Sequence, residues 1–198
     1  MSPSPSRPSD PAFLERLRAG DARAQRQLLR TYMPQLFRAA RGAGLSVESA
    51  EDVTQNTLIT FLEKVAKFEG RSHIRTWLFG ILYRKVAELR RREGRGGPLE
   101  DIDQVMESRF CADGRWARPP RPTDAALFAA EVRRHISECL EQVSTAQRMA
   151  FVLREIEALT TSEICAALEI TPSNLGVLLY RCRNKVRECL EARGIEAA

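Results

Sequence analysis

The fold is decided by a stretch that runs from Phe68 to Glu93 and reads FEGRSHIRTWLFGILYRKVAELRRRE. Its apolar residues recur at helical spacing, which predicts an amphipathic helix. Strong cations far outnumber acids along it, and large aromatic residues lie among the cations. Cations bind phosphates, and aromatic rings stack on unpaired bases for about 1–3 kcal/mol per base, so this combination indicates single-stranded or opening nucleic acid. The alternative is an ordinary buried stripe beneath a solvated basic face.

The rest of the sequence also favours helices. Aliphatic residues at helical spacing dominate its 198 residues, and runs that alternate β-branched with aromatic residues are missing. The length suits one large domain or two small ones. We predict an all-α protein of two small helical domains joined by a flexible linker, in which the C-terminal domain is a helix-turn-helix.

Changes in composition set the expected boundaries. Residues 1–11 alternate Ser and Pro, which predicts a disordered leader, and residues 94–124 are interrupted by Gly and Pro, which predicts the linker. The leader and the linker divide the rest of the chain into a first module at 12–93, a second module at 125–191 and a tail at 192–198. The linker carries an acidic patch made of Glu100, Asp101 and Asp103.

Two classes of protein are disfavoured. The longest apolar run, Leu78 to Leu82, is too short to cross a bilayer, and the N-terminus has no apolar signal core. We therefore expect a cytoplasmic protein without direct membrane insertion. The five cysteines form no CxxC pair, so we predict free buried thiols rather than metal ligands, and no metal or cofactor. Their expected burial also argues against direct redox sensing.

The first module is expected to carry a polar helix face. One helix is predicted from Pro11 to Arg18. A second is predicted from Ala22 to Ala43, with Asp21 as its N-cap, and the next helix begins after Ser46 or Ser49. That third helix has four residues on one face, as a partner-binding surface requires, although a solvated polar face is the ordinary alternative. These residues are Asp52, Gln55, Asn56 and Ile59.

The strongest local signal lies near the C-terminus. The residues from Thr160 to Glu163 form a capping box that opens a short helix, and Thr171-Pro172 supplies an N-cap and a first-turn proline for a longer one. This arrangement predicts a helix-turn-helix whose second helix enters the major groove by its N-terminal end, rather than an ordinary helical hairpin. Its outward residues are expected to be Ser173, Asn174, Val177, Tyr180, Arg181 and Asn184.

Gly176 is unusual inside this second helix. Glycine in a helix interior costs about 0.5–1 kcal/mol relative to alanine. Close approach to DNA or to another helix would explain its presence.

With both modules placed, the chain resembles a bacterial extracytoplasmic-function (ECF) sigma factor of the sigma-70 family over nearly its whole length after the leader. AEDVTQNTLITFLEKVAKFEG at residues 50–70 resembles the core-polymerase-binding helix, and RTWLFGIL with ELRRRE resembles the strand-opening region. AFVLREIEALTTSEICAALEITPSNLGVLLYRCRNKVRECL at residues 150–190 resembles the terminal helix-turn-helix. The resemblance implies a protein that binds core RNA polymerase, directs it to promoter DNA and assists strand opening. Many relatives are held inactive by an anti-sigma factor.

The resemblance also implies roles for residues of the first module. Asp52 and Gln55 match the acidic-polar signature that contacts the largest polymerase subunits, and Asn56 and Ile59 extend the same surface. The loop from Phe68 to Ile74 would hold a base flipped from the non-template strand, whereas Trp77 would support the helix from inside. The implied contacts to the minus-ten element are Phe68, Ser72, His73, Arg75, Tyr83, Arg84 and Arg91.

The minus-thirty-five element would be read by the second module. Tyr180 and Arg181 keep the family's aromatic-plus-arginine signature, whereas Gly176 and Val177 replace residues that are often polar or basic. This departure implies an unusual element or a greater share of backbone contacts. In the first module, Arg84 likewise stands where the family commonly has Asn. The implied contacts to the minus-thirty-five element are Thr171, Ser173, Asn174, Val177, Tyr180 and Arg181.

Two other functions are compatible with parts of the sequence. A conventional helix-turn-helix regulator that acts without core polymerase would leave the first module without a role, and it predicts tight operator binding by the protein alone. A nucleic-acid-modifying enzyme would use the basic aromatic stretch, but the sequence has neither a two-histidine metal motif nor a Gly-rich phosphate loop. We therefore expect promoter specification without catalysis.

Overall fold

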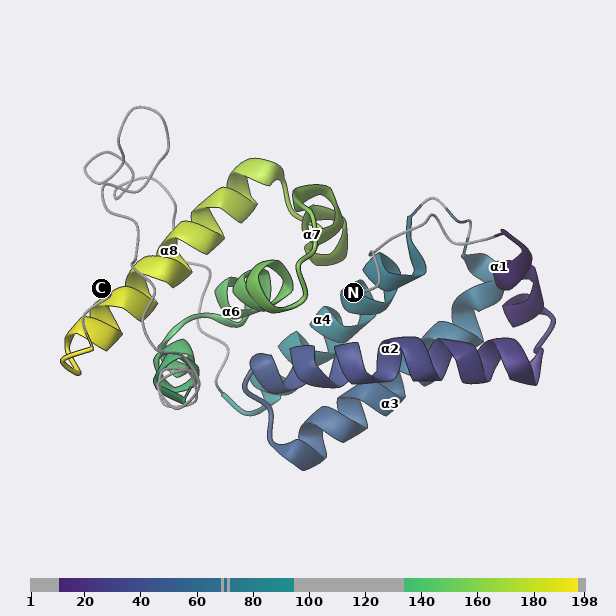
Figure 1. Cartoon of the computed structure of the whole chain (residues 1–198), viewed down its shortest axis with the longest axis horizontal. Coiled ribbons are helices and arrows are strands. Elements are labelled where there is room, and N and C mark those ends of the chain that lie inside the picture. Colours follow the sequence, from purple (N-terminus) through teal and green to yellow (C-terminus); the bar gives the residue numbers. More distant parts are fainter. Residues whose placement is uncertain (1–10, 69, 71, 95–133, 196–198) are drawn as a thin grey trace, which may run out of the picture.

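The computed structural model describes residues 11–68, 70, 72–94 and 134–195 (Figure 1). All regular secondary structure in these ranges is helical, which confirms the all-α prediction. The acidic patch of the expected linker lies outside the described residues, as does nearly all of the expected leader. No helix within these ranges is long and apolar enough to cross a membrane.

Helices α1 to α4 build the described part of the first module. The Asp21 side chain accepts a hydrogen bond from the amide of Arg23 at 2.9 Å, and the Ser46 side chain accepts one from the amide of Ser49 at 3.1 Å. Ser46 rather than Ser49 is therefore the cap of the third helix, and α2 runs through Pro34 as one helix. The elements are α1 (Pro11–Arg18), α2 (Ala22–Gly42), α3 (Val47–Lys64), the 3-10 turn η1 (Val65–Lys67) and α4 (Ile74–Arg92).

In the described part of the second module, the first element is a helix at residues 134–139. Capping boxes then start two further helices: Ser144 and Gln147 start α6, and Thr160 and Glu163 start α7, as predicted. The elements that follow residue 139 are η2 (Leu140–Gln142), α6 (Thr145–Phe151), the π-helical segment η3 (Val152–Ile156), α7 (Thr161–Leu168) and α8 (Pro172–Glu191).

The turn between α7 and α8 has the expected three residues. Glu169 ends α7 in the left-handed conformation with φ of 58°, and the Thr171 side chain accepts a hydrogen bond from the amide of Asn174 at 3.2 Å. Pro172 is the first residue of α8, where its missing amide hydrogen costs nothing. The predicted helix-turn-helix is therefore present.

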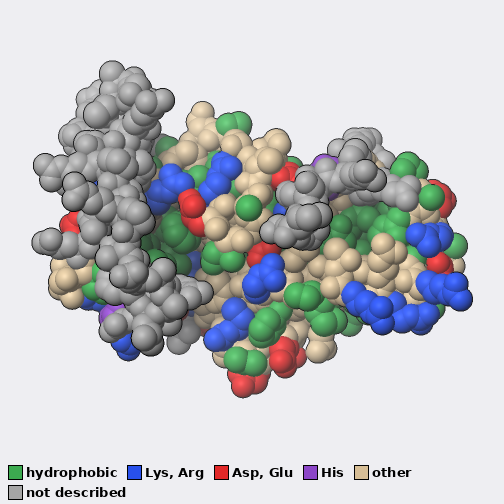
Figure 2. All heavy atoms as spheres, viewed as in Figure 1, with side chains coloured by type: hydrophobic (Ala, Val, Ile, Leu, Met, Phe, Trp, Pro, Cys, Tyr) green, Lys and Arg blue, Asp and Glu red, His purple; other side chains and the backbone are tan. Residues whose placement is uncertain are grey.

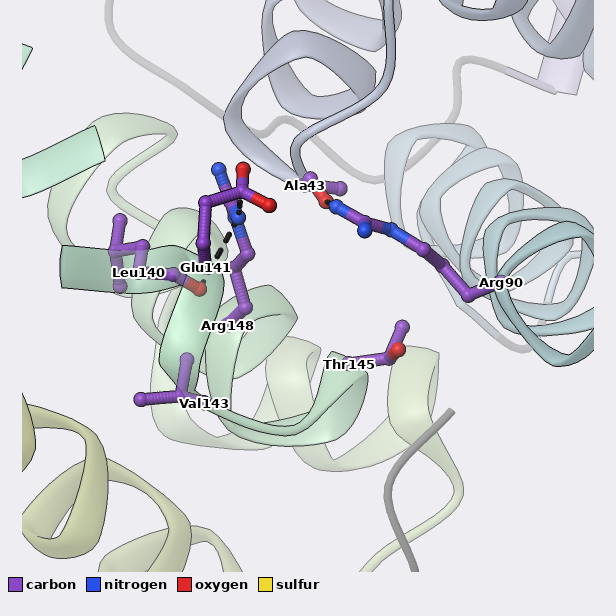
Figure 3. Close-up of a pocket in the computed structure, with 7 residues that line it drawn as sticks. All are labelled: Ala43, Arg90, Leu140, Glu141, Val143, Thr145 and Arg148. Carbon is purple, nitrogen blue, oxygen red and sulfur yellow. Dashed lines mark hydrogen bonds and ion pairs between the residues drawn. The ribbon is translucent and has the colours of Figure 1, made fainter. Parts of the chain in front are cut away.

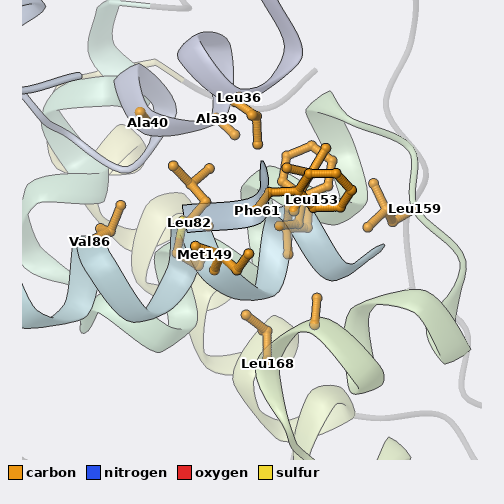
Figure 4. Close-up of a cluster of buried hydrophobic side chains, with 14 of the residues drawn as sticks. Leu36, Ala39, Ala40, Phe61, Leu82, Val86, Met149, Leu153, Leu159 and Leu168 are labelled. Atoms are coloured by element: carbon orange, nitrogen blue, oxygen red, sulfur yellow. The ribbon is translucent and has the colours of Figure 1, made fainter. Parts of the chain in front are cut away.

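The two modules share one buried apolar cluster (Figure 4). Leu36, Phe61 and Leu82 come from three helices of the first module, and Met149 and Leu153 come from the second; each is at most 1% exposed. Fully burying a side chain of this size contributes about 1.5–3 kcal/mol. The modules are thus packed against each other, with α4 in contact with both α3 and α7. Helical periodicity predicts which face of a helix is buried, but it does not predict what covers that face.

The prediction of free buried thiols is wrong for one pair of cysteines. Cys139 and Cys189 form a disulfide that links the 134–139 helix to α8. Cys165, which is half-buried, and Cys182, which is buried, are free. Cys111 lies outside the described residues. The pair was missed because 50 residues separate its members in sequence, and only the packing of α8 brings them together.

Candidate polymerase and nucleic-acid interfaces

The expected polymerase-binding face of α3 is open to solvent. Asp52, Gln55 and Asn56 are exposed, and Ile59 is 52% exposed although it is apolar. Figure 2 shows acidic and apolar side chains together at the lower edge, where α3 begins. The opposite face anchors α3 in the core and keeps this surface rigid. Its buried residues are Ala50, Val53, Thr54, Thr57, Leu58 and Phe61.

The loop before α4 is held by stacked aromatic rings. Phe68 is only 6% exposed, and its ring stacks on that of Trp77 with centroids 4.8 Å apart and planes at 10°. Trp77 in turn meets Phe61 edge to face at 5.1 Å. The backbone carbonyl of Phe68 accepts a hydrogen bond from Arg18 of α1. In this conformation Phe68 forms the inner wall of the loop, and Trp77 supports α4 from inside.

Ser72 and His73 complete this loop, and both are half-buried. His73 is the N-cap residue of α4, but its side chain makes no capping hydrogen bond. Its Nδ1 atom is buried and has no hydrogen-bond partner among the described residues. A buried polar atom without a partner is costly. The His73 ring nitrogen is therefore available to bond to a group that enters this loop.

Two arginines expected to contact the minus-ten element are bound to the second module. Nη2 of Arg75 donates hydrogen bonds to the backbone carbonyl of Glu157 at 2.6 Å and to its carboxylate at 3.4 Å. Nε of Arg75 also donates to Gln35 at 2.9 Å. Arg84 forms an exposed ion pair with Glu169, the residue that ends α7. Both cations therefore contribute to the junction between the modules.

Helix α7 covers the middle of α4. Gly80 is buried there, and a Cβ atom added to it would lie 3.2 Å from the backbone oxygen of Ala167. Tyr83 is half-buried beside it, and burial together with the nearby Glu169 raises the pKa of its hydroxyl. Arg91 is exposed near the end of α4. Three of the seven residues expected to contact the minus-ten element thus lie at the junction: Arg75, Tyr83 and Arg84.

Two arginines meet at the end of α2: Arg90 comes from the first module, and Arg148 comes from the second and bonds across the junction (Figure 3). Nη2 of Arg90 donates to the carbonyl of Ala43 at 2.8 Å, and Nε of Arg148 donates to that of Gly42 at 2.7 Å. Arg148 also pairs with Glu141 at 2.9 Å, while burial lowers the pKa of its guanidinium. Both cations satisfy carbonyl groups that the helix leaves free. They line a cavity of about 330 Å³.

The N-terminal half of α8 is available at the surface. Thr171 and Ser173 are exposed. No heavy atom among the described neighbours lies within 4 Å of a Cβ atom added to Gly176. Packing against another helix therefore does not explain this glycine. The other residues expected to contact the minus-thirty-five element are half-buried: Asn174, Val177, Tyr180 and Arg181.

Comparison with known families identifies both modules. Residues 28–96 match Sigma-70 region 2, and residues 133–186 match Sigma-70, region 4. A curated relative from Haemophilus influenzae, a probable RNA polymerase sigma factor, is 30% identical over 152 residues, which cover 73% of this chain and 78% of the relative. The chain belongs to the sigma-70 family of RNA polymerase sigma factors. A sigma factor directs RNA polymerase to promoters, so a conventional regulator is not favoured.

Further relatives place this sigma factor in the ECF group. The ECF RNA polymerase sigma-E factor of Escherichia coli K12 is 26% identical over 180 residues, which cover 90% of this chain and 92% of that protein. The factor of the same name from Salmonella typhimurium LT2 matches with the same identity and coverage.

Solved structures share the fold of this sigma factor. CnrH, in complex with the cytosolic domain of CnrY, aligns with a TM-score of 0.66 and 21% identity over 91% of this chain and 96% of that one. The sigma factor RpoE from Bartonella quintana, in complex with the anti-sigma factor NepR, aligns with a TM-score of 0.61 and 23% identity over 84% of this chain and 96% of that one.

Sequence reasoning missed the residues that join the two modules of this sigma factor. Glu157 is the central one, because its buried carboxylate accepts hydrogen bonds from Arg38 and Arg75. The only signal in the sequence is an acid between Ile156 and Leu159, inside a largely apolar run. Nor did the sequence show that Arg148 would bond to α2. In the described part of the chain, no group of three or more His, Cys, Asp or Glu residues could hold a metal ion.

Proposed function

We propose that this sigma factor docks on core RNA polymerase through the exposed face of α3. The observation that carries the proposal is an apolar Ile59, 52% exposed, in line with Asp52, Gln55 and Asn56 on a helix whose other face is fixed in the core. Exposed apolar residues bordered by polar ones are typical of protein-binding surfaces. The carboxylate of Asp52 would give this surface its preference for a basic partner.

The first module would then assist strand opening. Its loop from residue 68 to 74 and the cations of α4 would hold non-template bases of the minus-ten element, with Ser72, His73 and Tyr83 as polar contacts. Phe68 would act from beneath the loop, because its ring is stacked on Trp77. Arg75, Arg84 and Arg91 would bind phosphates once they are accessible. Binding unpaired bases favours the open promoter by mass action, without chemical catalysis.

The second module would read the minus-thirty-five element as duplex DNA. The exposed start of α8 fits this role, with Thr171, Ser173 and Asn174 in its first turn. Val177, Tyr180 and Arg181 follow along the helix, and the open space around Gly176 would let the DNA backbone approach closely. Half or more of protein–DNA hydrogen bonds go to the phosphate and sugar groups, so such an approach would add affinity.

These roles require the modules to separate. Arg75 and Arg84 are paired with Glu157 and Glu169 in the packed form, and α7 lies over the middle of α4. We propose that binding to polymerase selects an open arrangement in which α4 is exposed, and that the packed form is the resting state. The free energy of the junction then sets the fraction of molecules that are open. The apparent affinity for polymerase is reduced in proportion to that fraction.

An anti-sigma factor would act on the same equilibrium. One solved structure of similar fold contains an anti-sigma factor, and another contains the cytosolic domain of a partner protein. A partner that binds both modules would stabilise the packed form and block the surfaces described above. We further propose that the protein acts in the cytoplasm, where its polymerase and promoter DNA are found.

Start-site mapping of in vitro transcription tests this function. Sigma-free bacterial core polymerase would transcribe a random promoter library with and without the purified protein. Discrete starts that appear only with the protein, and that share two sequence elements, are expected. Binding to core without any starts would contradict promoter direction, and tight operator binding without core would favour a conventional regulator.

A further inference from the structure

A disulfide closes the second module on itself. Cys139 ends the described 134–139 helix, and Cys189 lies in the last turn of α8; their Cα atoms are 5.7 Å apart, which is typical of a disulfide. The loop that it closes contains η2, α6, η3, α7 and nearly all of α8. No residue of the first module lies inside this loop. The bond therefore constrains the unfolded chain of the DNA-reading module alone.

The size of this constraint follows from the length of the loop. For residues 50 apart, the chain-entropy relation gives a loss of about a thousandfold in the ratio of folded to unfolded module when the bond is broken. A module of this size buries little apolar surface, so its folded state has a small margin of stability. Reduction would then deplete the folded form of the second module.

The packing around the bond is weak enough for the bond to matter. Cys139 belongs to a small apolar cluster that is separate from the main core, and its other buried members are Leu140, Cys182 and Val186. The exposed ion pair between Arg193 and Glu138 adds little to the attachment of the 134–139 helix. The disulfide is thus a main link between this helix and α8.

The two sulfur atoms differ in accessibility. Cys139 is 0% exposed, whereas Cys189 is half-buried, so a reagent from solvent reaches the Cys189 sulfur first. Cys182 lies in the same cluster but is fully buried, and burial raises the pKa of its thiol to about 12. It therefore stays protonated and does not compete as a nucleophile.

We propose that Cys139 and Cys189 form a reversible oxidation site, oxidised by a hydroperoxide and reduced by a dithiol, and that the oxidised form is the one competent to read the minus-thirty-five element. The proposal rests on the role proposed above for α8. In the forward direction, the Cys189 thiolate attacks the peroxide and becomes a sulfenic acid, releasing water or an alcohol. The Cys139 thiol then attacks that sulfur and gives up its proton, and the hydroxyl group leaves as water.

Reduction reverses the same two-electron change. A thiolate of the dithiol attacks the Cys189 sulfur, the disulfide breaks, and Cys139 leaves as a thiolate that takes up a proton. The second thiol of the reagent then attacks the mixed disulfide, which releases Cys189 and leaves the reagent as its own disulfide. Such a site would couple promoter recognition to the redox state of the cell without a separate sensor.

The full-length protein, treated either with hydrogen peroxide or with dithiothreitol, tests the proposal. Alkylation followed by mass spectrometry should find Cys139 and Cys189 unalkylated after peroxide, because they form the disulfide, and alkylated after dithiothreitol. The reduced form should lose up to about a thousandfold in the folded-to-unfolded ratio of the second module, measured by denaturant titration. Its binding to minus-thirty-five duplex on core polymerase should fall about tenfold or more, while its affinity for core should not fall.

Matched variants separate this site from other thiol effects. Cys165→Ser removes a free, half-buried cysteine of α7 and should keep the full response. Cys189→Ser should behave as the reduced form under both treatments; if it fails to fold, the comparison of the two wild-type forms still decides. Equal stability and equal duplex binding of the oxidised and reduced wild type would overturn the proposal. A stability response without any promoter-directed transcription in either form would instead count against the function proposed for the protein.

Discussion

Arg75 of α4 donates a hydrogen bond of 2.6 Å to the backbone carbonyl of Glu157, a residue 82 positions away in the second module. The Glu157 carboxylate is only 1% exposed, and it also accepts a hydrogen bond from Nε of Arg38 at 3.2 Å. A buried carboxylate is tolerated because two guanidinium groups from the first module surround it. The relationship therefore exists only while the modules are packed, and it provides a direct test of the resting state.

Replacing this carboxylate should open the molecule. Glu157→Gln keeps the size of the side chain but removes its charge, so Arg38 and Arg75 lose their common counter-ion. Hydrogen bonds to charged groups contribute about 1.5–3 kcal/mol, and we expect the junction to weaken by about 2 kcal/mol. Small-angle scattering should show a larger radius of gyration, and affinity for core polymerase should rise by up to about tenfold.

Glu155→Gln is the control for that experiment. Glu155 lies on the π-helical segment η3, which Glu157 directly follows, but Glu155 pairs with Arg183 inside the second module, and both side chains are substantially exposed. Its removal should leave both the scattering profile and the affinity unchanged. Equal affinities for the two variants would contradict the proposed role of the packed form.

Gly80 tests the same junction through packing instead of charge. In the separated form, Gly80→Ala should stabilise α4 by about 0.5–1 kcal/mol, because alanine restricts the unfolded chain. In the packed form the added methyl group would lie 3.2 Å from the backbone oxygen of Ala167, so α7 must move away. Both effects favour the open arrangement. We expect limited proteolysis to cut between the modules faster in this variant, and an unchanged rate would argue against a tight α4–α7 contact.

Local features of this fold could be predicted from sequence, and long-range ones could not. The bounds of α1 and the caps at Asp21 and Thr160 agree with the predictions, because each depends on residues within one turn. The contact between Arg75 and Glu157 depends on how two modules pack, and nothing in helical periodicity encodes that. The disulfide between Cys139 and Cys189 is missed for the same reason.

The candidate site shows the same division. The predicted exposed face of α3 is present, since the helix alone fixes that arrangement; its residues are Asp52, Gln55, Asn56 and Ile59. Phe68 is different: the family resemblance implied a contact with DNA, but in the structure its ring stacks on Trp77 in the core. In the sequence, an aromatic residue next to cations is compatible both with a contact to DNA and with burial in the core. Only its neighbours in space distinguish the two.

Asp52 is expected to act in polymerase binding and not in folding. Because it is exposed and forms no ion pair with any described residue, Asp52→Ala should change the free energy of unfolding by less than about 0.5 kcal/mol. Affinity for core polymerase should fall about tenfold or more, and transcription should be lost with it. Glu51→Ala, the exposed neighbour that points to a different side of α3, is the matched control. A normal affinity in Asp52→Ala would exclude the proposed contact.

Gly176 gives a prediction in which stability and function change in opposite directions. A methyl group at this position meets no described atom within 4 Å, so Gly176→Ala should stabilise α8 by about 0.5–1 kcal/mol. The same methyl group would prevent close approach of the DNA backbone, and binding to a minus-thirty-five duplex should weaken by about tenfold, or about 1.4 kcal/mol. Thermal melting and duplex binding, measured on the same preparation, report the two effects separately.

The comparison has an internal control, because affinity for core polymerase depends on α3 and should not change in Gly176→Ala. A variant that is more stable, binds core normally and yet fails to bind the duplex would identify the glycine as a requirement of DNA approach. A variant that is more stable and binds the duplex as well as the wild type would show that this face of α8 does not approach DNA closely. The half-buried Tyr180 and Arg181, further along the helix, would then have to supply the contacts.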